Sequence, residues 1–236
     1  PPEDRQVNAQ LALQRLGAAL SRAGVGFKFG RKIERIIGGQ VFQMPDGERF
    51  DRIVLATGGA ALPAFVGPRG AHLEHGLVAT VPVKGQMLAL APVNGGPRHV
   101  IHTRDVYIAP KSRWVLVGAT SERGRADTDI EPARIAALKA KAAELVSVLG
   151  NAPEVTAWAG VRPGTPDDAP MIGQTAIPGV FAALGHYRNG ILFAPATAEL
   201  VADQVIDGKV SPLAAAFDPL RFDKQGEAPH SPSQQN

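Results

Sequence analysis

The chain has 236 residues, of which 44% are hydrophobic and 20% are charged. This length allows one large domain or two interleaved smaller ones, and the composition is that of an ordinary globular protein. The net charge is +3 and the basic residues are scattered among acidic ones, so we expect no nucleic-acid partner. The absence of cysteine excludes disulfides, thiolate metal ligands, catalytic thiols and any cofactor tethered through a cysteine sulfur.

The sequence also carries signals about location. No apolar run is long enough to cross a bilayer, and the first ten residues lack the basic and apolar regions of a signal peptide. We therefore expect a cytoplasmic protein without a membrane partner. The chain begins without Met, directly before a helical pattern, which suggests a fragment or a processed product.

The first third predicts one helix and several strands. Apolar residues at helical spacing indicate an amphipathic helix over 6–23, which we expect to lie on a sheet. Apolar runs between turn signals predict strands at 25–29, 31–37, 40–44 and 52–56. From 60 to 80, Gly and Pro interrupt the pattern, as in a segment that crosses between two sub-domains.

The remainder predicts an antiparallel sheet followed by alternating helices and strands. Four further runs are predicted to form the antiparallel sheet, at 81–90, 98–103, 105–109 and 113–119. Helices are predicted from Glu131 to about Leu149 and from about 191 to 207, with strands between them at 155–161 and 179–184. The polar, Pro/Ser-rich stretch 223–236 is predicted to be a disordered tail.

Three segments contain residues suited to ligand binding. The buried strand at 52–56 ends in Thr57, Gly58 and Gly59, where the backbone can approach a ligand closely, although a tight strand exit explains these glycines equally well. Arg162 ends an apolar strand and needs an anionic partner, either a ligand carboxylate or an internal acid such as Asp167 or Asp168.

The third segment is the loop GHYRNG at 185–190, between a strand and a helix that begins near Ile191. The free N–H groups at that helix start favour an electron-rich or anionic group. Bulky residues between two glycines are uncommon in a plain connector, so a functional role is favoured here.

Other candidates are weaker. Tyr107 lies in a predicted strand and its hydroxyl needs a partner, for which a backbone group is the more common choice. His72 and His75 lie in a Gly-rich irregular segment without a nearby cage of carboxylates, so we expect surface residues and no metal site. No hydrolase triad order and no phosphate-cradling Gly-Lys-Ser/Thr loop occurs.

Several motifs together resemble the D-amino-acid oxidase family of FAD-dependent flavoproteins, and within it the glycine oxidases of thiamine biosynthesis. The motifs are PVKGQ at 82–86, VYIAP at 106–110, VLVGAT at 115–120, AGVRPGTPDDAPMIG at 159–173 and GHYRNGILFAPATAELVADQV at 185–205. Their order and spacing match throughout, and the similarity runs from Val7 to about Phe222. The last two motifs are much more specific than a lone glycine pattern.

The resemblance implies an α/β (α+β) fold with a partial Rossmann-like flavin-binding domain and an antiparallel-sheet substrate domain. The flavin-binding part would comprise 1–80 and 174–222, and the substrate-binding part 81–173. The implied reaction is the oxidative deamination of glycine or another small amine or amino acid. Hydride passes from the α-carbon to the flavin, the imine hydrolyses, and oxygen gives peroxide.

The resemblance also assigns roles to residues. Arg162 looks like the clamp on the substrate carboxylate, Tyr107 like the hydroxyl beside it, and Arg188 like a second substrate contact; no side chain is implied as an acid–base catalyst. The residues that look like flavin contacts are Ile33, Thr57, Gly58, Gly59, His186, Tyr187, Arg188, Asn189, Gly190, Ile191 and Leu192.

Two departures from the family pattern leave alternatives open. Ser121 stands where some relatives carry an apolar residue near the substrate, which affects the polarity of the pocket. The N-terminal βαβ unit with its G-x-G-x-x-G loop is absent, so this chain alone is expected to bind FAD poorly and to expose a sheet edge. The alternatives are a D-amino-acid dehydrogenase, a tRNA-modifying oxidase domain, and a non-catalytic subunit that needs a partner flavin domain; a homo-oligomer is expected when the protein is full-length.

Overall fold

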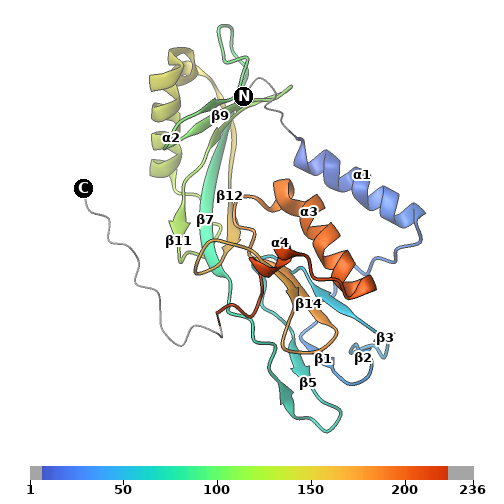
Figure 1. Cartoon of the computed structure of the whole chain (residues 1–236). Helices are drawn as coiled ribbons and strands as arrows, with labels where there is room; N and C mark the ends of the chain where they lie inside the picture. The colour runs from blue at the N-terminus through green and yellow to red at the C-terminus, as the bar shows by residue number, and fades with distance from the viewer. Residues whose placement is uncertain (1–6, 223–236) are drawn as a thin grey trace.

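The computed structural model describes residues 7–222, so the predicted tail at 223–236 lies outside the described residues. Three sheets and the helices that pack on them form a mixed α/β protein, as the sequence predicts (Figure 1). The longest strands, β7 and β12, run side by side through the middle of the molecule (Figure 1).

The largest sheet has six strands and all its pairs are antiparallel. Its order is β11-β7-β10-β9-β8, and β12 pairs with the other edge of β7. The strands are β7 (Val81–Leu90), β8 (Ile101–His102), β9 (Tyr107–Pro110), β10 (Val115–Gly118), β11 (Glu122–Arg123) and β12 (Glu154–Gly164). The predicted antiparallel sheet is therefore confirmed, with β12 as its longest member.

Helix α2 (Pro132–Leu145) covers one face of this sheet (Figure 1). Pro132 occupies its first turn, where a missing N–H is no loss, and Ala and Leu dominate the rest. Leu138 of α2 belongs to the same buried core as Leu88, Leu90 and Val117 of the sheet. A 3₁₀ turn (Ser147–Asn151) then leads into β12.

The alternation of side chains along β7 separates this core from the opposite face. Lys84 and Gln86 share the α2 side with Leu88, whereas Gly85 and Met87 point to the other side. Met87 stands opposite Gly118 on β10, and Gly118 stands opposite Tyr107 on β9. The face of the sheet away from α2 therefore brings Gly85, Met87, Gly118 and Tyr107 together.

The other two sheets are built from shorter strands. One has the order β3-β2-β1-β5-β6 and the other β13-β14-β4. Their members are β1 (Arg35–Ile37), β2 (Phe42–Gln43), β3 (Arg49–Phe50), β4 (Ile53–Leu55), β5 (Ala64–Val66), β6 (His72–Leu73), β13 (Met171–Gln174) and β14 (Val180–Leu184). Phe42 and Phe65 meet edge to face, with ring centroids 6.3 Å apart, in the core that these sheets share.

Strands β5 and β6 lie in the segment that the sequence indicates as irregular, and no strand forms at 25–29. β5 has three residues and is held by parallel pairing with β1, including Ile36 opposite Phe65. Such a strand is too short for an alternation signal, so pairing partners decide it.

Strand β4 lies at the edge of its sheet. It pairs in parallel with β14, and within residues 7–222 its other edge has no partner strand. Val54 at the middle of β4 is 44% exposed. Helix α3 (Gly190–Ala202) continues as a π-helical turn (Asp203–Asp207) and packs through Val201 on Ile172 and Phe181; the short helix α4 (Pro212–Ala215) follows.

Helix α1 (Ala9–Arg22) forms where the sequence predicts it. Its first turn is capped by Asn8, whose Oδ1 accepts from the N–H of Leu11 at 3.1 Å. None of its residues is buried, and the helix stands apart from the sheets in Figure 1. The prediction that it lies on a sheet is wrong for the described chain, because none of its apolar residues is buried against a sheet.

Candidate functional site

A cavity of about 550 Å³ opens beside the six-stranded sheet, and Tyr107, Arg162 and Arg188 all line it. Tyr107 comes from β9, Arg162 from β12 and Arg188 from the loop before α3. These elements are far apart in sequence, and the pairing of β7 with β12 and of β10 with β9 brings the first two together. The three residues that resemble substrate contacts thus meet in one place.

The internal acids that compete for Arg162 are already engaged. Asp167 pairs with Arg221 at 2.8 Å and Asp168 pairs with Arg123 at 2.8 Å. Among residues 7–222, Arg162 forms no ion pair and donates one hydrogen bond, from Nη1 to the carbonyl oxygen of Thr120 at 3.3 Å. Of the two alternatives that the sequence leaves open, the structure removes the internal ion pair.

The charge of Arg162 is poorly compensated in this cavity. Burial and the neighbouring guanidinium of Arg188 lower the pKa of Arg162 from its ordinary value. A carboxylate placed between these two cations would offset both effects and could accept two parallel hydrogen bonds. The electrostatics of the cavity therefore favour an anionic group.

The hydroxyl of Tyr107 has a weak partner. It donates to the thioether sulfur of Met87 at 3.1 Å, and thioethers are poor acceptors. Burial raises the pKa of Tyr107, so the phenol keeps its proton at neutral pH and remains a donor. A carboxylate in the cavity would be a better acceptor than the sulfur.

The loop GHYRNG is held against the six-stranded sheet by Tyr187. Its N–H donates to the carbonyl of Pro163 at 2.8 Å, and its hydroxyl shares a hydrogen bond of 3.1 Å with Ser121. The backbone of Tyr187 has a φ of 50°, a conformation uncommon outside glycine. The guanidinium of Arg188 lies 5.1 Å from the Tyr187 ring centroid, within range of a cation–π contact.

A second cavity, of about 520 Å³ and almost wholly apolar, lies between β4 and α3. His186 and Gly190 line it, and the Nε2 atom of His186 shares a hydrogen bond of 2.9 Å with the hydroxyl of Thr197. Burial lowers the pKa of His186, which favours the neutral imidazole.

The start of α3 is open beside this cavity. The Asn189 side chain makes no capping hydrogen bond, so the first N–H groups of the helix have no side-chain cap. Ile191 and Leu192 follow, 50% and 73% exposed. This helix end suits an electron-rich planar group with apolar edges.

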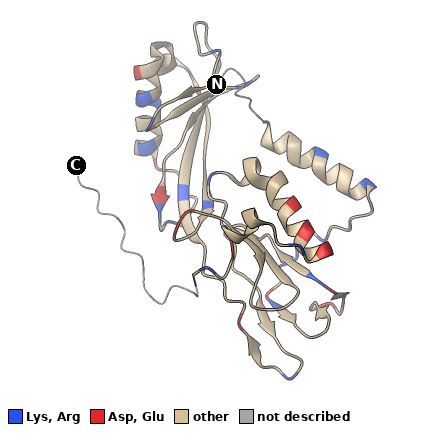
Figure 2. Ribbon diagram, viewed as in Figure 1, with Lys and Arg blue, Asp and Glu red and all other residues tan. Residues whose placement is uncertain are grey.

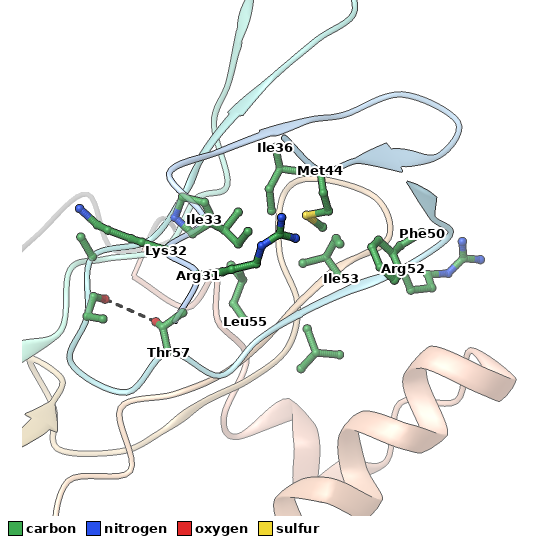
Figure 3. Close-up of a pocket in the computed structure, with 14 residues that line it drawn as sticks. Arg31, Lys32, Ile33, Ile36, Met44, Phe50, Arg52, Ile53, Leu55 and Thr57 are labelled. Carbon is green, nitrogen blue, oxygen red and sulfur yellow. Dashed lines mark hydrogen bonds between the residues drawn. The ribbon is translucent and has the colours of Figure 1, made fainter. Parts of the chain in front are cut away.

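A third cavity, of about 560 Å³, contains Ile33 and Thr57 (Figure 3). Ile53 and Leu55 of β4 form part of its apolar wall, and Arg31 reaches across it in Figure 3. Thr57 donates from its hydroxyl to the carbonyl of Ala60 at 3.4 Å. Val54 lines both this cavity and the one beside α3, so the two cavities flank β4.

Of the remaining residues that resemble flavin contacts, Arg188 lines the first cavity, and the others are neighbours in sequence of the lining residues Thr57, His186 and Gly190. Gly58 has a φ of 63° and turns the chain after β4. The position of a Cβ on Gly59 would be 4.0 Å from Pro163, which follows Arg162. The turn after β4 therefore approaches the end of β12 that carries Arg162.

Sequence reasoning did not single out three residues that contact Arg162 or Tyr107: Gly85 and Thr120 contact Arg162, and Met87 contacts Tyr107. A glycine inside an otherwise apolar strand was the available signal for Gly85, because such a glycine marks a close approach of another group. Nothing in the sequence pairs Met87 with Tyr107 or Thr120 with Arg162. Those contacts depend on strand register.

The charges are distributed unevenly over the elements (Figure 2). In this view β7 and β12 show one basic segment each, which the sequence assigns to Lys84 and Arg162. Lys84 is buried and pairs with Asp127 and Glu131 on the α2 side, in contrast to Arg162. The residues that the structure describes contain no cluster of His, Asp and Glu able to hold a metal ion.

Within residues 7–222 no helix combines the length and apolarity needed to cross a bilayer. His72 pairs with Glu74 at 3.0 Å, and the Nδ1 atom of His75 accepts from the N–H of Leu77 at 3.0 Å. Both histidines thus make local contacts.

Comparison with known proteins identifies relatives over most of the chain. The family described as FAD dependent oxidoreductase matches residues 2–204. The bifunctional protein ThiO/ThiG of Nostoc sp. is 38% identical over 237 residues, which cover 95% of this chain and 34% of that protein. The glycine oxidase of Geobacillus kaustophilus is 38% identical over 158 residues, 66% of this chain and 40% of that protein.

Solved structures agree with the sequence relatives. The crystal structure of glycine oxidase from Geobacillus kaustophilus matches with a TM-score of 0.78 and 32% identity, and covers 92% of this chain and 59% of that one. L-proline dehydrogenase from P. horikoshii has a TM-score of 0.73 at 17% identity, which shows the fold alone.

The chain thus spans about a third of the bifunctional relative and about three fifths of the glycine oxidase structure. The predicted family and the predicted mixed α/β fold are both confirmed, because a single match covers 203 of the 236 residues and the fold extends over nearly all of them. This chain belongs to the FAD dependent oxidoreductase family.

Proposed function

We propose that the complete protein oxidises glycine or another small amine or amino acid with FAD and oxygen, in connection with thiamine biosynthesis. The observation that carries the proposal is the cavity that Arg162, Arg188 and Tyr107 line together, in which no acid of the described residues pairs with Arg162. The named relatives support it: one is a glycine oxidase and another carries the name ThiO/ThiG.

The residues of the cavity would bind and orient the substrate. Arg162 binds the carboxylate through its planar guanidinium, and Tyr107 donates its hydroxyl to the same group. The substrate is then fixed at its carboxylate end, so the α-carbon has a defined position relative to the loop at 185–190. A second contact from Arg188 limits the space for large side chains.

The residues around β4 fit FAD by their chemistry. The two apolar cavities accept aromatic rings, the open start of α3 suits the electron-rich edge of a flavin, and the Thr57-Gly58-Gly59 turn lets a ligand approach the backbone. Ile33, Thr57, His186 and Gly190 would line the binding site, with Gly58, Gly59, Tyr187, Arg188, Asn189, Ile191 and Leu192 beside it. FAD supplies the acceptance of hydride from the substrate and the return of electrons to oxygen.

We propose two functional parts within the chain. Residues 1–80 and 174–222 would hold the cofactor, and residues 81–173 would hold the substrate. The sheets support this division, because β7 to β12 pair among themselves. We further propose that the complete protein is a cytoplasmic homo-oligomer that binds no nucleic acid. Light scattering would test its oligomeric state.

The central test is a kinetic comparison in the complete protein. We expect the purified protein to show flavin absorbance and to form peroxide from glycine, sarcosine or D-alanine. Replacing Arg162 by Met removes a charge-assisted hydrogen bond, so kcat/KM should fall about 10- to 100-fold. The control is Arg113→Met, an exposed arginine in the loop before β10, which should retain full activity.

Two results would overturn the proposal. Absence of bound flavin in the complete protein would exclude flavin chemistry, and equal activity of both variants would exclude Arg162 as the carboxylate ligand. Flavin that is reduced by amine but not reoxidised by oxygen would instead identify a dehydrogenase. A protein that binds FAD only together with a separate partner would identify a subunit.

A further inference from the structure

We propose that Gly85 and Thr120 are positioning residues that set the guanidinium of Arg162 in the cavity. This inference deepens the proposed function, because it concerns how the carboxylate clamp is held. Two independent observations carry it, one steric and one from hydrogen bonding.

The steric observation is at Gly85 in the middle of β7. A Cβ added to Gly85 would lie 2.0 Å from Nη1, 2.3 Å from Nη2 and 2.4 Å from Cζ of Arg162. The register explains this contact: Arg162 stands opposite Val83, so Gly85 is its diagonal neighbour on the same face of the sheet. The guanidinium therefore lies directly on the backbone of Gly85, in space that any side chain would occupy.

The hydrogen-bonding observation is at Thr120. Its carbonyl oxygen accepts the hydrogen bond from Arg162, and its own position is fixed from three sides. Its hydroxyl donates to Glu122 at 2.9 Å and accepts from the N–H of Gln86 at 2.9 Å, while its N–H donates to the carbonyl of Gln86 at 3.2 Å.

The backbone around Thr120 departs from regular pairing in a way that presents this carbonyl. Gly118 stands opposite Met87 and Glu122 stands opposite Lys84, so three residues (119–121) face only two (85–86) on β7. One extra residue of this kind bends a strand and redirects its groups. The redirected carbonyl of Thr120 and the bare backbone of Gly85 together hold one guanidinium.

The opposite face of β7 anchors this arrangement. Gln86 donates to Glu122 at 3.1 Å and accepts from the N–H of Glu131 at 2.8 Å, at the start of α2. Gln86 is fully buried, so its bonds are shielded from water. Gln86 thereby links the segment that carries Thr120 to the start of α2.

The chain offers a matched control for Gly85. Gly160 on β12 stands directly opposite Gly85, yet a Cβ on Gly160 would have no atom within 4 Å. Neither glycine has a positive φ, so alanine is compatible with the backbone of both. Gly85→Ala should displace the guanidinium at the end of the flexible Arg162 side chain, whereas Gly160→Ala should displace no neighbouring group.

The test compares these two variants in the complete flavoprotein. We expect Gly85→Ala to raise KM about 10- to 100-fold with a smaller change in kcat, because substrate binding at the carboxylate is lost. Gly160→Ala should leave KM within about twofold, and both variants should unfold at the same temperature as the parent. Thr120→Val should also raise KM, and Thr120→Ser, which keeps the hydroxyl, should restore it.

A second readout does not depend on turnover. The Nε–Hε signal of Arg162 in ¹⁵N nuclear magnetic resonance, assigned by its loss in Arg162→Lys, should shift in Gly85→Ala and stay in place in Gly160→Ala. An unmoved Arg162 signal and an unchanged KM in Gly85→Ala would overturn the inference. A shifted signal in a protein that oxidises no amine would support the positioning role and reject the proposed function, so the two failures are distinguishable.

Discussion

At the scale of single residues, the site depends on polar groups that lack good partners within the chain. The phenol of Tyr107 is the plainest case, since its acceptor is a sulfur atom. A half-buried donor with a poor acceptor can bond to a better acceptor when a ligand offers one. Arg162 is in the same position, with a single long hydrogen bond to a carbonyl.

For Tyr107 we expect a moderate effect on binding. Removal of its hydroxyl in Tyr107→Phe should weaken substrate binding by roughly 0.5–1.5 kcal/mol, the net value of one hydrogen bond. Steady-state kinetics of the complete protein should show KM rising a few-fold, with the unfolding temperature unchanged. A loss of stability without a change in KM would mean that the hydroxyl serves the core.

Gly185 has a structural role that can be tested in the same region. Its φ is 74°, and a Cβ would lie 2.3 Å from Cγ2 of the buried Thr165. Gly185→Ala should therefore reduce the free energy of unfolding by about 1–3 kcal/mol, as measured in denaturant. Gly190→Ala is the control, because its Cβ would meet His186 at an ordinary 3.7 Å. Similar stability of the two variants would contradict this account.

At the scale of elements, the turn after β12 is tied to the segment after α4 by one ion pair. Arg221 donates to both carboxylate oxygens of Asp167 and to the carbonyls of Pro170 and Ala169. The hydrogen bond from Arg221 is the largest of the effects that lower the pKa of Asp167 from 3.8 to about 2.

This shift predicts a dependence of stability on pH. A carboxylate with a lowered pKa stabilises the folded state above its ordinary pKa, and the contribution disappears as the pH falls toward 2. Asp167→Asn should therefore unfold at a lower temperature than the parent at pH 6, and the difference should vanish between pH 4 and pH 2. A difference that persists at pH 2 would show that the ion pair is not its cause.

Long elements were predictable from the sequence, and short ones were not. β7 occupies residues 81–90 as expected, because its apolar run is continuous and ends at turn signals. β5 and β6 were missed because their pairing with β1 and with each other, and not their own pattern, makes them strands. The helix at the N-terminus was predicted, but its expected sheet is not within the described chain.

Some residues of the candidate site could likewise be predicted from the sequence, and others could not. Arg162 and GHYRNG could be found because an arginine in apolar sequence and bulky residues between glycines are unusual on their own terms. The choice between a ligand and an internal acid for Arg162 needed the structure, since it depends on Arg221 and Arg123 taking the acids first. Gly85 and Thr120 needed the register of three strands.

At the scale of the whole molecule, apolar surface gathers around α1, β4 and the start of α3. Leu13, Val54 and Leu192 are 65%, 44% and 73% exposed. Large exposed apolar areas and an open strand edge are typical of surfaces that contact other protein segments. Two of the cavities lie beside this open edge, because Val54 of β4 lines both of them.

This openness predicts the behaviour of residues 1–236 expressed alone. We expect weak binding of FAD in a fluorescence titration and self-association in light scattering, because the free edge of β4 can pair with another chain. A charged side chain on that edge opposes such pairing, so Val54→Lys should reduce the association while the unfolding temperature stays the same. A monomeric parent that binds FAD tightly would contradict this prediction.

The position of Val54 links the open edge of β4 to the two cavities beside it. Since Val54 lines the cavities on both sides of β4, a strand added to that edge would complete a wall of both cavities at once. Under the proposed function, strand addition and FAD binding are then thermodynamically linked, and each strengthens the other by the same factor. Flavin retention would thus report on the completeness of the sheet, and a mutation far from the flavin could release it by loosening that strand.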